Sequence, residues 1–289
     1  MGISTAIGIG IQFSRGGGQD WASYWASHSN FWGKGRSGLT IPDDFSNDAS
    51  ILPSCGYFNG TNSFITAPTA TKDLTFTQFT LEWYGKFNSV PTTYAALLGR
   101  NLGGIQNGDL LIYTFVDAAK REIIFTNYDT TINSNIDLAV AGAIDIDYHI
   151  IATQGTTGNF ILYVNGVNKG ESARINVAAS ASEPIMCGAN VITTPTSFAP
   201  VSVYTARVYN VKLTDEELAA RWAHTDVTRG FILCWDFMGD IGSSTEHDRS
   251  GQSNHGTFVG TAPYYTYSAQ GCQDNLNNGY KRYFKNGLW

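Results

Sequence analysis

The stretch APVSVYTARVYNVKLTDEELAARWAH, residues 199–224, decides the fold of this chain. Its first half is rich in β-branched and aromatic side chains, which suit a pleated, half-buried β-strand. Thr214 and Glu217 have the spacing of a capping box, in which each side chain satisfies a free N–H group of the first helical turn. Leu213 and Leu218 flank that cap as a hydrophobic staple. The stretch therefore predicts a strand, a sharp corner and a short helix, although any surface helix packed on a sheet would satisfy the same pattern.

Short strands are predicted throughout the middle of the chain. Asn165-Gly166 stands between two apolar runs, which is typical of a type I′ hairpin. In the stretch FTLEWYGKF, residues 79–87, the alternation places Phe79, Leu81 and Trp83 on one face. Many short strands separated by turns indicate a β-sandwich or jelly roll rather than alternating strands and helices. The expected strands are 56–59, 63–67, 78–87, 94–99, 109–116, 121–127, 147–153, 159–165, 167–171, 184–188, 200–209, 231–237 and 256–260.

Three motifs follow one another in a particular order. They are YFNG at 57–60 with a later Phe-Ile pair, DYHIIA at 147–152 with the hairpin that follows it, and RVYN at 207–210 before LTDEEL at 213–218. In this order they resemble the laminin-G-like, concanavalin A-like jelly-roll family over roughly residues 55–268. The resemblance implies an all-β antiparallel sandwich with one short helix. It assigns no function by itself, because one sandwich fold hosts many functions.

The last part of the chain departs from the family's order. FILCWDF at 231–237 and DRSGQSNHGT at 248–257 resemble the segment that normally begins the family's domain, yet here they follow the helix. A second, truncated copy is one explanation, although about sixty residues could hardly bury a core of their own. The other is circular permutation, which compact domains tolerate because their chain ends often lie close together. We expect 231–237 to fill the first-strand position, antiparallel beside 203–209.

The N-terminal residues 1–54 differ in composition from the rest of the chain. Isoleucines alternate with glycines near the start, and such a strand could add itself to the sheet edge of another subunit or could be a frayed terminus. The opening MGISTAIGIGIQFSRGGGQ resembles the openings of virion-associated proteins of tailed phages that infect gut Bacteroides-type bacteria. We therefore expect a docking arm, and its candidate docking residues are Ile7, Ile9, Ile11 and Phe13.

Aromatic residues supply the candidates for glycan binding. A dense aromatic block, Trp21 to Trp32, has helical spacing, so it is either a packed helix or a platform for sugar rings. Further tyrosines near the C-terminus could stack on sugars from loops. The glycan candidates are Trp25, Trp32, Tyr264, Tyr265 and Tyr267.

The family resemblance implies a structural Ca²⁺ where the opening strand meets its loop. Calcium needs several hard oxygen ligands. The alternative is that the stretch 248–251 forms a plain Asx turn. Tyr204 and Thr205 stand where the family's last strand often carries an acidic pair, which is a departure from the calcium pattern. The candidate ligands are Asp236, Asp240, Asp248 and Asn254.

No catalytic set is recognised in the sequence. Relatives that hydrolyse glycans carry paired carboxylates on one strand, and the pattern Glu-x-Asp-x-Glu does not occur here. Asp145 and Asp147 share a strand face by their spacing, but the start of a strand is typical of a solvated edge. We therefore expect no enzymatic activity.

Composition argues against several partners. A net charge of −6 with 18 Lys and Arg residues offers no dense basic surface for nucleic acid. No apolar run has the length of a membrane span, and the start lacks the regions of a signal peptide, so we expect no membrane insertion and synthesis in the host cytoplasm. The four cysteines include no Cys-x-x-Cys pair and are expected to be free, mostly buried thiols.

These observations favour a phage virion structural protein, such as a head fibre, a decoration protein or a tail-associated adhesin. It would be located in the virion, dock onto other virion proteins through the arm, form a homo-oligomer and display a lectin-like sandwich toward a host-surface glycan. The alternative is a carbohydrate-binding module without a particle role, and a glycan hydrolase ranks third. The expected domains are the arm and linker 1–54, the sandwich 55–270 and a tail 271–289.

Overall fold

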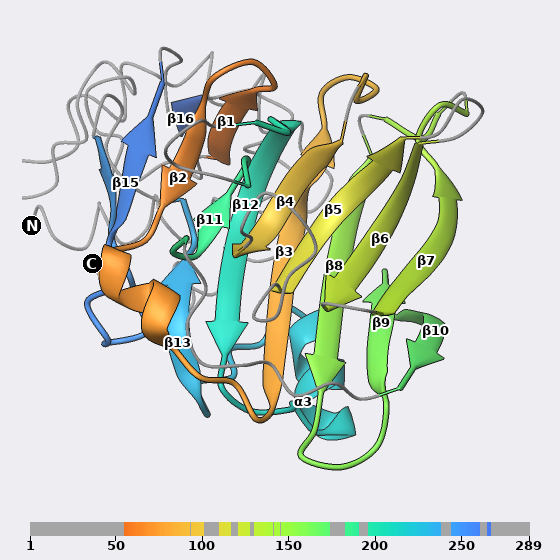
Figure 1. Ribbon diagram of the computed structural model, residues 1–289, viewed down its shortest axis with the longest axis vertical. Coiled ribbons are helices and arrows are strands. Elements are labelled where there is room, and N and C mark those ends of the chain that lie inside the picture. The colour runs from red at the N-terminus through yellow and green to blue at the C-terminus, as the bar shows by residue number, and fades with distance from the viewer. Residues whose placement is uncertain are drawn as a thin grey trace, which may run out of the picture. The chain divides into compact units, whose positions relative to one another are not determined.

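The computed structural model describes residues 55–266, with gaps at 93, 101–109, 117–120, 128–129, 141, 145, 174–182, 191–195, 238–243 and 261–264. Within these residues the backbone forms two antiparallel sheets that pack face to face (Figure 1). This architecture confirms the predicted sandwich. Ser54–Thr266 form one compact unit, and the predicted domain borders at 54 and 270 stay predictions.

Sheet A has the strand order β10-β9-β8-β3-β12-β1-β16, and β13 also pairs with β12. Its strands are β1 (Cys55–Asn59), β3 (Phe79–Phe87), β8 (Asp147–Gln154), β9 (Phe160–Val164), β10 (Val167–Ser172), β12 (Pro200–Tyr209), β13 (Phe231–Trp235) and β16 (Tyr265–Thr266). The helix α3 (Asp215–Trp222) packs on the outer face of this sheet (Figure 1).

Sheet B has the strand order β14-β15-β2-β11-β4-β5-β6-β7. Its strands are β2 (Phe64–Thr66), β4 (Ala95–Arg100), β5 (Leu110–Val116), β6 (Arg121–Asn127), β7 (Thr130–Asp137), β11 (Met186–Cys187), β14 (Thr245–Glu246) and β15 (Gly256–Val259). A 3-10 helix covers Thr69–Asp73 between β2 and β3. No helix within the described residues combines the length and the apolar character that crossing a membrane requires.

The main core lies between the two sheets and follows the predicted alternation. Phe79, Leu81 and Trp83 all point from β3 into this core. Gly85 continues the same face, and a Cβ atom there would lie 2.4 Å from the carbonyl oxygen of Ser202 on β12. Glycine at this position therefore lets two central strands approach each other closely.

The expected strands are all present near their expected places. The hairpin between β9 and β10 has positive φ angles at Asn165 (50°) and Gly166 (77°), as a type I′ turn requires, so that prediction is confirmed. The short strands β14 and β16 and the longer strand β7 were not expected. β7 reads TTINSNID, and its asparagines are more typical of turns than of strands.

The predicted position of the tail strand is confirmed. β13 pairs antiparallel with β12, with Val208 opposite Leu233 and Ala206 opposite Trp235. β1 pairs with the other half of the same edge of β12, where Gly56 lies opposite Val203. One edge of β12 is thus completed by two strands from opposite ends of the described chain.

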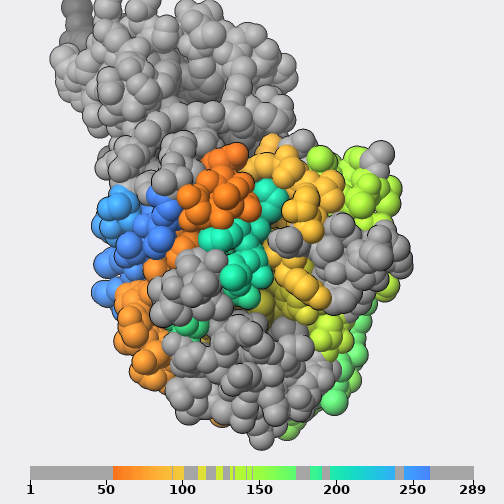
Figure 2. Space-filling view, turned by 45° about the horizontal axis from the view of Figure 1, so that its top comes forward, coloured from red at the N-terminus to blue at the C-terminus, as the bar shows by residue number. Residues whose placement is uncertain are grey.

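The tail also joins the second sheet. β15 pairs with β2 in sheet B, and Phe258 lies opposite Ile65. In the space-filling view the blue tail segment therefore lies directly against the orange segment that holds β1 and β2 (Figure 2). The segment after the helix contributes strands to both layers and is an integral part of the sandwich.

The outer edge of β13 is closed by polar groups from the loop that follows it. The Cys234 N–H donates to Asp248 Oδ1 at 2.9 Å, and the Arg249 N–H donates to the Cys234 carbonyl at 2.9 Å. The Asn254 side-chain amide donates to the carbonyl of Ile232 at 2.7 Å. An open strand edge leaves backbone N–H and C=O groups that can pair with another chain. This loop forms hydrogen bonds with several of those groups in β13.

The Trp235→Ala variant tests whether the tail strand belongs to the core. The Trp235 side chain is fully buried, and its Nε1–H donates to the Asn254 carbonyl at 3.1 Å. We expect the substitution to lower the free energy of unfolding by about 3–5 kcal/mol, the usual cost of truncating a buried tryptophan. Urea unfolding followed by circular dichroism measures this change.

The matched control is Val259→Ala, because Val259 lies on β15 with 37% of its surface exposed. Its cost should stay within about 1 kcal/mol, as for most exposed positions. Equal unfolding midpoints for the Trp235 variant and the parent protein would show that β13 adds nothing to the core.

Candidate functional site

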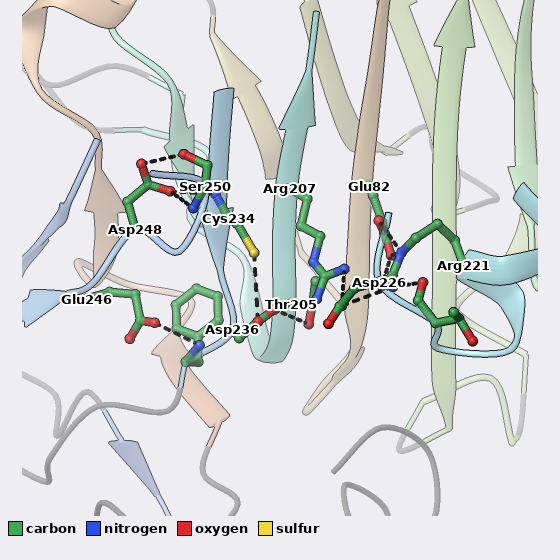
Figure 3. A network of polar contacts seen from close by, with 12 residues as sticks. Glu82, Thr205, Arg207, Arg221, Asp226, Cys234, Asp236, Glu246, Asp248 and Ser250 are labelled. Atoms are coloured by element: carbon green, nitrogen blue, oxygen red, sulfur yellow. Dashed lines mark hydrogen bonds and ion pairs between the residues drawn. The ribbon is translucent and has the colours of Figure 1, made fainter. Parts of the chain in front are cut away.

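Glu82 is the centre of a buried polar cluster on the outer face of sheet A. The alternation that turns Leu81 and Trp83 inward turns Glu82 outward, beneath α3, where its side chain is fully enclosed. Arg221 of α3 donates to this carboxylate from Nη2 at 2.7 Å and from Nε at 3.0 Å (Figure 3). The Tyr209 hydroxyl donates to it at 3.0 Å.

His149 on β8 completes the shell around Glu82, with Nε2 at 2.8 Å from Oε1. Burial alone would raise the pKa of Glu82, but Arg221, His149 and Arg207 outweigh it and hold that pKa well below its usual value. Burial lowers the pKa of His149 despite the neighbouring carboxylate. A neutral imidazole therefore donates its Nε2–H to an ionised Glu82, because a carboxylate can only accept.

Arg207 on β12 extends the cluster toward the tail strand. Its Nη2 donates to Asp236 Oδ1 at 2.8 Å, and its Nη1 donates to Asp226 Oδ1 at 3.3 Å (Figure 3). The Thr205 hydroxyl adds a bond to Asp236 at 3.1 Å. Burial would raise the pKa of Asp236, but the adjacent Arg207 lowers it below its ordinary value. The ion pair therefore fastens the end of β13 to β12.

The start of α3 is fixed as its sequence predicts. The Glu217 N–H donates to Thr214 Oγ1 at 3.3 Å, and the Thr214 N–H donates to Glu217 Oε2 at 2.8 Å, which confirms the capping box. Leu213 and Leu218 share a small apolar cluster with Ile151 and other residues, so the staple is also confirmed. The helix thus covers Glu82 and keeps water away from it.

Aromatic and imidazole rings surround the end of α3. The rings of His149 and His224 are stacked, with centroids 5.5 Å apart and planes 14° apart. Trp222 meets His149 edge-on at 4.6 Å, and Tyr84 lies 5.0 Å from His224. His224 has a φ angle of 54° just after the helix. Burial, with His149 and Arg221, lowers the pKa of His224 to about 4.

This cluster can hold elements together, but it is not placed for catalysis. Glu82 is fully enclosed, and Arg221 and Asp236 are also buried. An acid or base must reach the proton that it moves, and an enclosed, ion-paired carboxylate does not. The cluster is therefore a structural lock between β3, β12, β13 and α3.

Two of the residues predicted to bind calcium, Asp248 and Asp236, accept hydrogen bonds from groups of the protein itself. Asp248 Oδ1 accepts from the N–H groups of Cys234 and Ser250, and its Oδ2 accepts from Ser250 Oγ at 2.6 Å and from the Asn254 N–H at 2.8 Å (Figure 3). The bond from Ser250 N to Asp248 is an Asx turn, the alternative that the sequence allowed. Asp236 is paired with Arg207.

Asp236 and Asp248 thus accept hydrogen bonds through the oxygens that a metal ion would take, whereas Asn254 bonds to Asp248 and Ile232 only through its N–H groups, and Asp240 lies outside the described residues. In the part of the chain that the structure covers, no three His, Cys, Asp or Glu side chains are grouped to hold a metal. The calcium site as a whole stays a prediction.

The docking and glycan candidates fall almost entirely outside the described residues. Tyr265 is the exception, because its backbone in β16 pairs with Gly56 of β1. Their roles stay predictions. The residues outside are Ile7, Ile9, Ile11, Phe13, Trp25, Trp32, Tyr264 and Tyr267.

The described cysteines agree with the expectation of free thiols. Cys55, Cys187 and Cys234 are free and buried. Burial raises the pKa of the Cys187 thiol, so it stays protonated at neutral pH. Cys272 lies outside the described residues.

Sequence reasoning did not identify a tyrosine pair on the outer face of sheet B. Tyr94 precedes β4 and has 45% of its surface exposed, and its ring centroid lies 6.2 Å from that of Tyr113 on β5. The alternation in LLIYTFV, residues 110–116, separates Tyr113 from Leu110 and Ile112, but it does not show which face meets solvent. Sequence reasoning also missed the Glu82 cluster, because Glu82 and Arg221 are 139 residues apart.

Two antiparallel sheets with a capped helix on one outer face define a lectin-like jelly roll. The chain belongs to the Concanavalin A-like lectin/glucanases superfamily, whose profile matches residues 59–219. The matched stretch ends before β13, so the tail strand lies beyond the part that the profile recognises. No curated protein sequence is similar enough to count as a match.

Several solved structures share the fold. A protein of Bacteroides ovatus, provisionally assigned as carbohydrate-binding, has 15% identity and a TM-score of 0.57, over 73% of this chain and 61% of that chain. The heptameric SAP-like pentraxin of Limulus polyphemus has 13% identity and a TM-score of 0.46, over 61% and 85%. The CBM40 of the Ruminococcus gnavus IT-sialidase has 19% identity and a TM-score of 0.42, over 58% and 95%. These similarities concern the fold alone.

The Glu82→Gln variant tests the lock. It keeps the shape of the side chain but leaves Arg221 and Arg207 without their shared anion. Breaking a buried ion pair typically costs about 3–5 kcal/mol, and we expect a loss of that size in the free energy of unfolding. Urea unfolding at pH 7.5 measures the change.

The control is Arg229→Ala, which removes the pair between Arg229 and Glu217 at the solvent-exposed start of α3. An exposed pair contributes about 0–1 kcal/mol. Similar losses for the two variants would contradict the lock.

The His224→Asn variant tests the pH dependence of the same region. The unfolded chain takes up a proton at His224 near its ordinary pKa of 6.5, whereas the folded protein does so only near about 4. Acid therefore favours unfolding, and this contribution to stability is lost as the pH falls from 6.5 toward 4. Asparagine tolerates the positive φ angle.

We expect the free energy of unfolding of the variant to fall less than that of the parent protein across this window. Burial lowers the pKa of His149 too, so part of the slope should remain in the variant. Parallel stability curves from pH 7.5 to pH 4 would contradict the burial of His224.

Proposed function

We propose that this protein is a structural component of a phage particle and that its sandwich binds glycans. Membership of a lectin and glucanase superfamily supports a sugar ligand. The observation that favours binding over hydrolysis is the position of the buried carboxylates. Glu82 and Asp236 are enclosed and ion-paired, and Asp248 holds a turn. Each of them stabilises the fold, and none is free for the acid and base steps of glycoside hydrolysis.

The particle role is supported by the two ends of the sandwich. Cys55, where β1 begins, lies opposite Thr266, where β16 ends. The first and last residues that the structure describes are thus neighbours on one sheet edge. A docking arm attached there can bind other virion proteins while the rest of the sandwich faces away. The phage-like opening and the isoleucine–glycine alternation support such an arm, and a homo-oligomer would multiply weak contacts to host glycans.

The second candidate function is a carbohydrate-binding module without a particle role. Superfamily membership alone favours it, because the family profile begins at residue 59 and includes none of the arm.

Deletion of residues 1–18 separates the two candidates. The full chain and the deleted chain would be produced in a phage-infected host, and purified particles would be probed for each by immunoblot. We expect the full chain on particles and the deleted chain only in the soluble fraction, with both showing the same melting temperature. If the full chain is absent from particles, or the deleted chain is still present on them, the docking proposal fails.

A further inference from the structure

Two histidine rings are stacked where the end of α3 meets sheet A. His149 lies on β8 and His224 follows the helix, and their ring planes are 14° apart with centroids 5.5 Å apart. His149 is buried and His224 is half-buried. Two protonated imidazoles at this separation would repel each other, because like charges interact strongly where little water surrounds them. The stack therefore suits neutral rings.

The buried ions beside the stack are already balanced. Arg207 and Arg221 are paired with two buried carboxylates, Asp236 and Glu82. Asp226 also contacts both arginines, but 48% of its side chain is exposed, so water screens its charge. A proton on either ring would therefore give this set of buried groups an excess positive charge.

Charged groups from four elements face the two rings. Burial, His149 and Arg221 lower the pKa of His224 to about 4, although Glu82 opposes them. Burial also lowers the pKa of His149, although its hydrogen bond to Glu82 opposes this. If this part of the molecule opened, both rings could take up protons near the ordinary pKa of histidine. The titratable and charged groups around the pair are Glu82 and Tyr84 on β3, Asp147 on β8, Arg207 and Tyr209 on β12, Arg221 on α3, and Asp226 beyond the helix.

The helix α3 depends on contacts with sheet A because it is short. It has eight residues, and a helix of that length is not stable in water unless it packs against the rest of a protein. Leu218 packs in a small apolar cluster on the outer face of the sheet. The last turn is held by the bond from Arg221 to Glu82 and by Trp222, which meets His149 edge-on at 4.6 Å. Loss of the last-turn contacts would therefore release the helix.

The main core is separate from the cluster beneath α3. It lies between the two sheets, and it shares none of its buried residues with that cluster. Regions with few buried contacts open locally at a lower free energy than the core does. Acid should therefore open the outer face of sheet A before it unfolds the sandwich.

We propose that the stacked pair of His149 and His224 is an acid-sensitive switch. Protonation of the pair releases α3 and uncovers Glu82, Ile151 and Tyr209 on the outer face of sheet A, while the two sheets stay packed. The device lies within the fold, so it depends neither on a glycan nor on a particle. It goes beyond a general loss of stability in acid, because one named part of the molecule opens first.

Hydrogen exchange of the full chain, followed by mass spectrometry at pH 7.5 and pH 4.5, tests the switch. Protection factors, which correct for the effect of pH on exchange itself, are compared for residues 213–224 and for β12. Protection of 213–224 should fall by roughly 70-fold or more at the lower pH, as expected when opening returns the pKa of His224 from about 4 to its ordinary 6.5.

The extent of the opening is measured in the same experiment. At pH 4.5 the protection of 213–224 should be at least about tenfold lower than that of β12. It should also respond little to low concentrations of urea, because a local opening exposes little surface, whereas exchange of β12 through global unfolding should respond strongly.

Two variants assign the change to the pair. His224→Asn tolerates the positive φ angle and removes one proton site, so the fall in protection should be at least about tenfold smaller. His149→Gln keeps an amide donor for Glu82 and should also reduce the fall. Each variant is compared at pH 7.5 by circular dichroism, and the test rests on whichever is folded. The matched control is His247→Asn, an exposed histidine after β14, which should behave as the parent protein does.

Three results would overturn the switch. The first is equal protection of 213–224 and β12 at pH 4.5, because α3 would then open only together with the whole sandwich. The second is protection of 213–224 that does not change between the two pH values. The third is a fall in the folded histidine variants as large as that in the parent protein.

Discussion

The pairing of β13 with β12 is the constraint on which the rest of the structure depends. β12 lies between β3 on one side and, on the other, β1 and β13, which share its second edge. Without β13, half of that edge and the fully buried rings of Trp235 and Phe237 would be missing from the core. The segment after the helix is therefore as much a part of the sandwich as the segment before it.

Buried charge fixes this arrangement in one register. Arg207 binds Asp236 at the end of β13, and Arg221 brings α3 down onto Glu82. Such groups add little net stability, because removing ions from water is costly, but a mispaired strand would leave one of them alone in the interior. We infer that the ions specify the position of β13 and α3, while the apolar core between the sheets supplies most of the stability.

The polar cluster around Glu82 also covers one outer face of the sandwich. The outer face of sheet A is closed by α3 and its ion pairs, so its polar groups are used within the protein. On sheet B, Tyr94 lies just before β4 with 45% of its surface exposed, and its ring contacts that of Tyr113 on β5.

Local features of the fold could be predicted from the sequence, because each depends on neighbouring residues. The alternation around Trp83, the Asn165-Gly166 turn and the capping box at Thr214 are examples. The position of β13 was also predicted, since its motif resembles a strand of known place in the family. β7 was missed because its asparagines are typical of turns.

The candidate site was much less predictable. Glu82 and Arg221 meet only after the chain has folded, and alternation alone does not say which face of a sheet leaves a tyrosine exposed. Asp248 stays a predicted metal ligand, but the sequence did not show that backbone N–H groups donate to both of its oxygens.

Native-state hydrogen exchange of the β13 backbone amides tests the central claim most directly. If β13 completes the core, its amides should exchange only through global unfolding, with the same free energy as those of β12. The result that would contradict this account is exchange of β13 at a much lower free energy, as in a frayed terminus, while β12 remains protected.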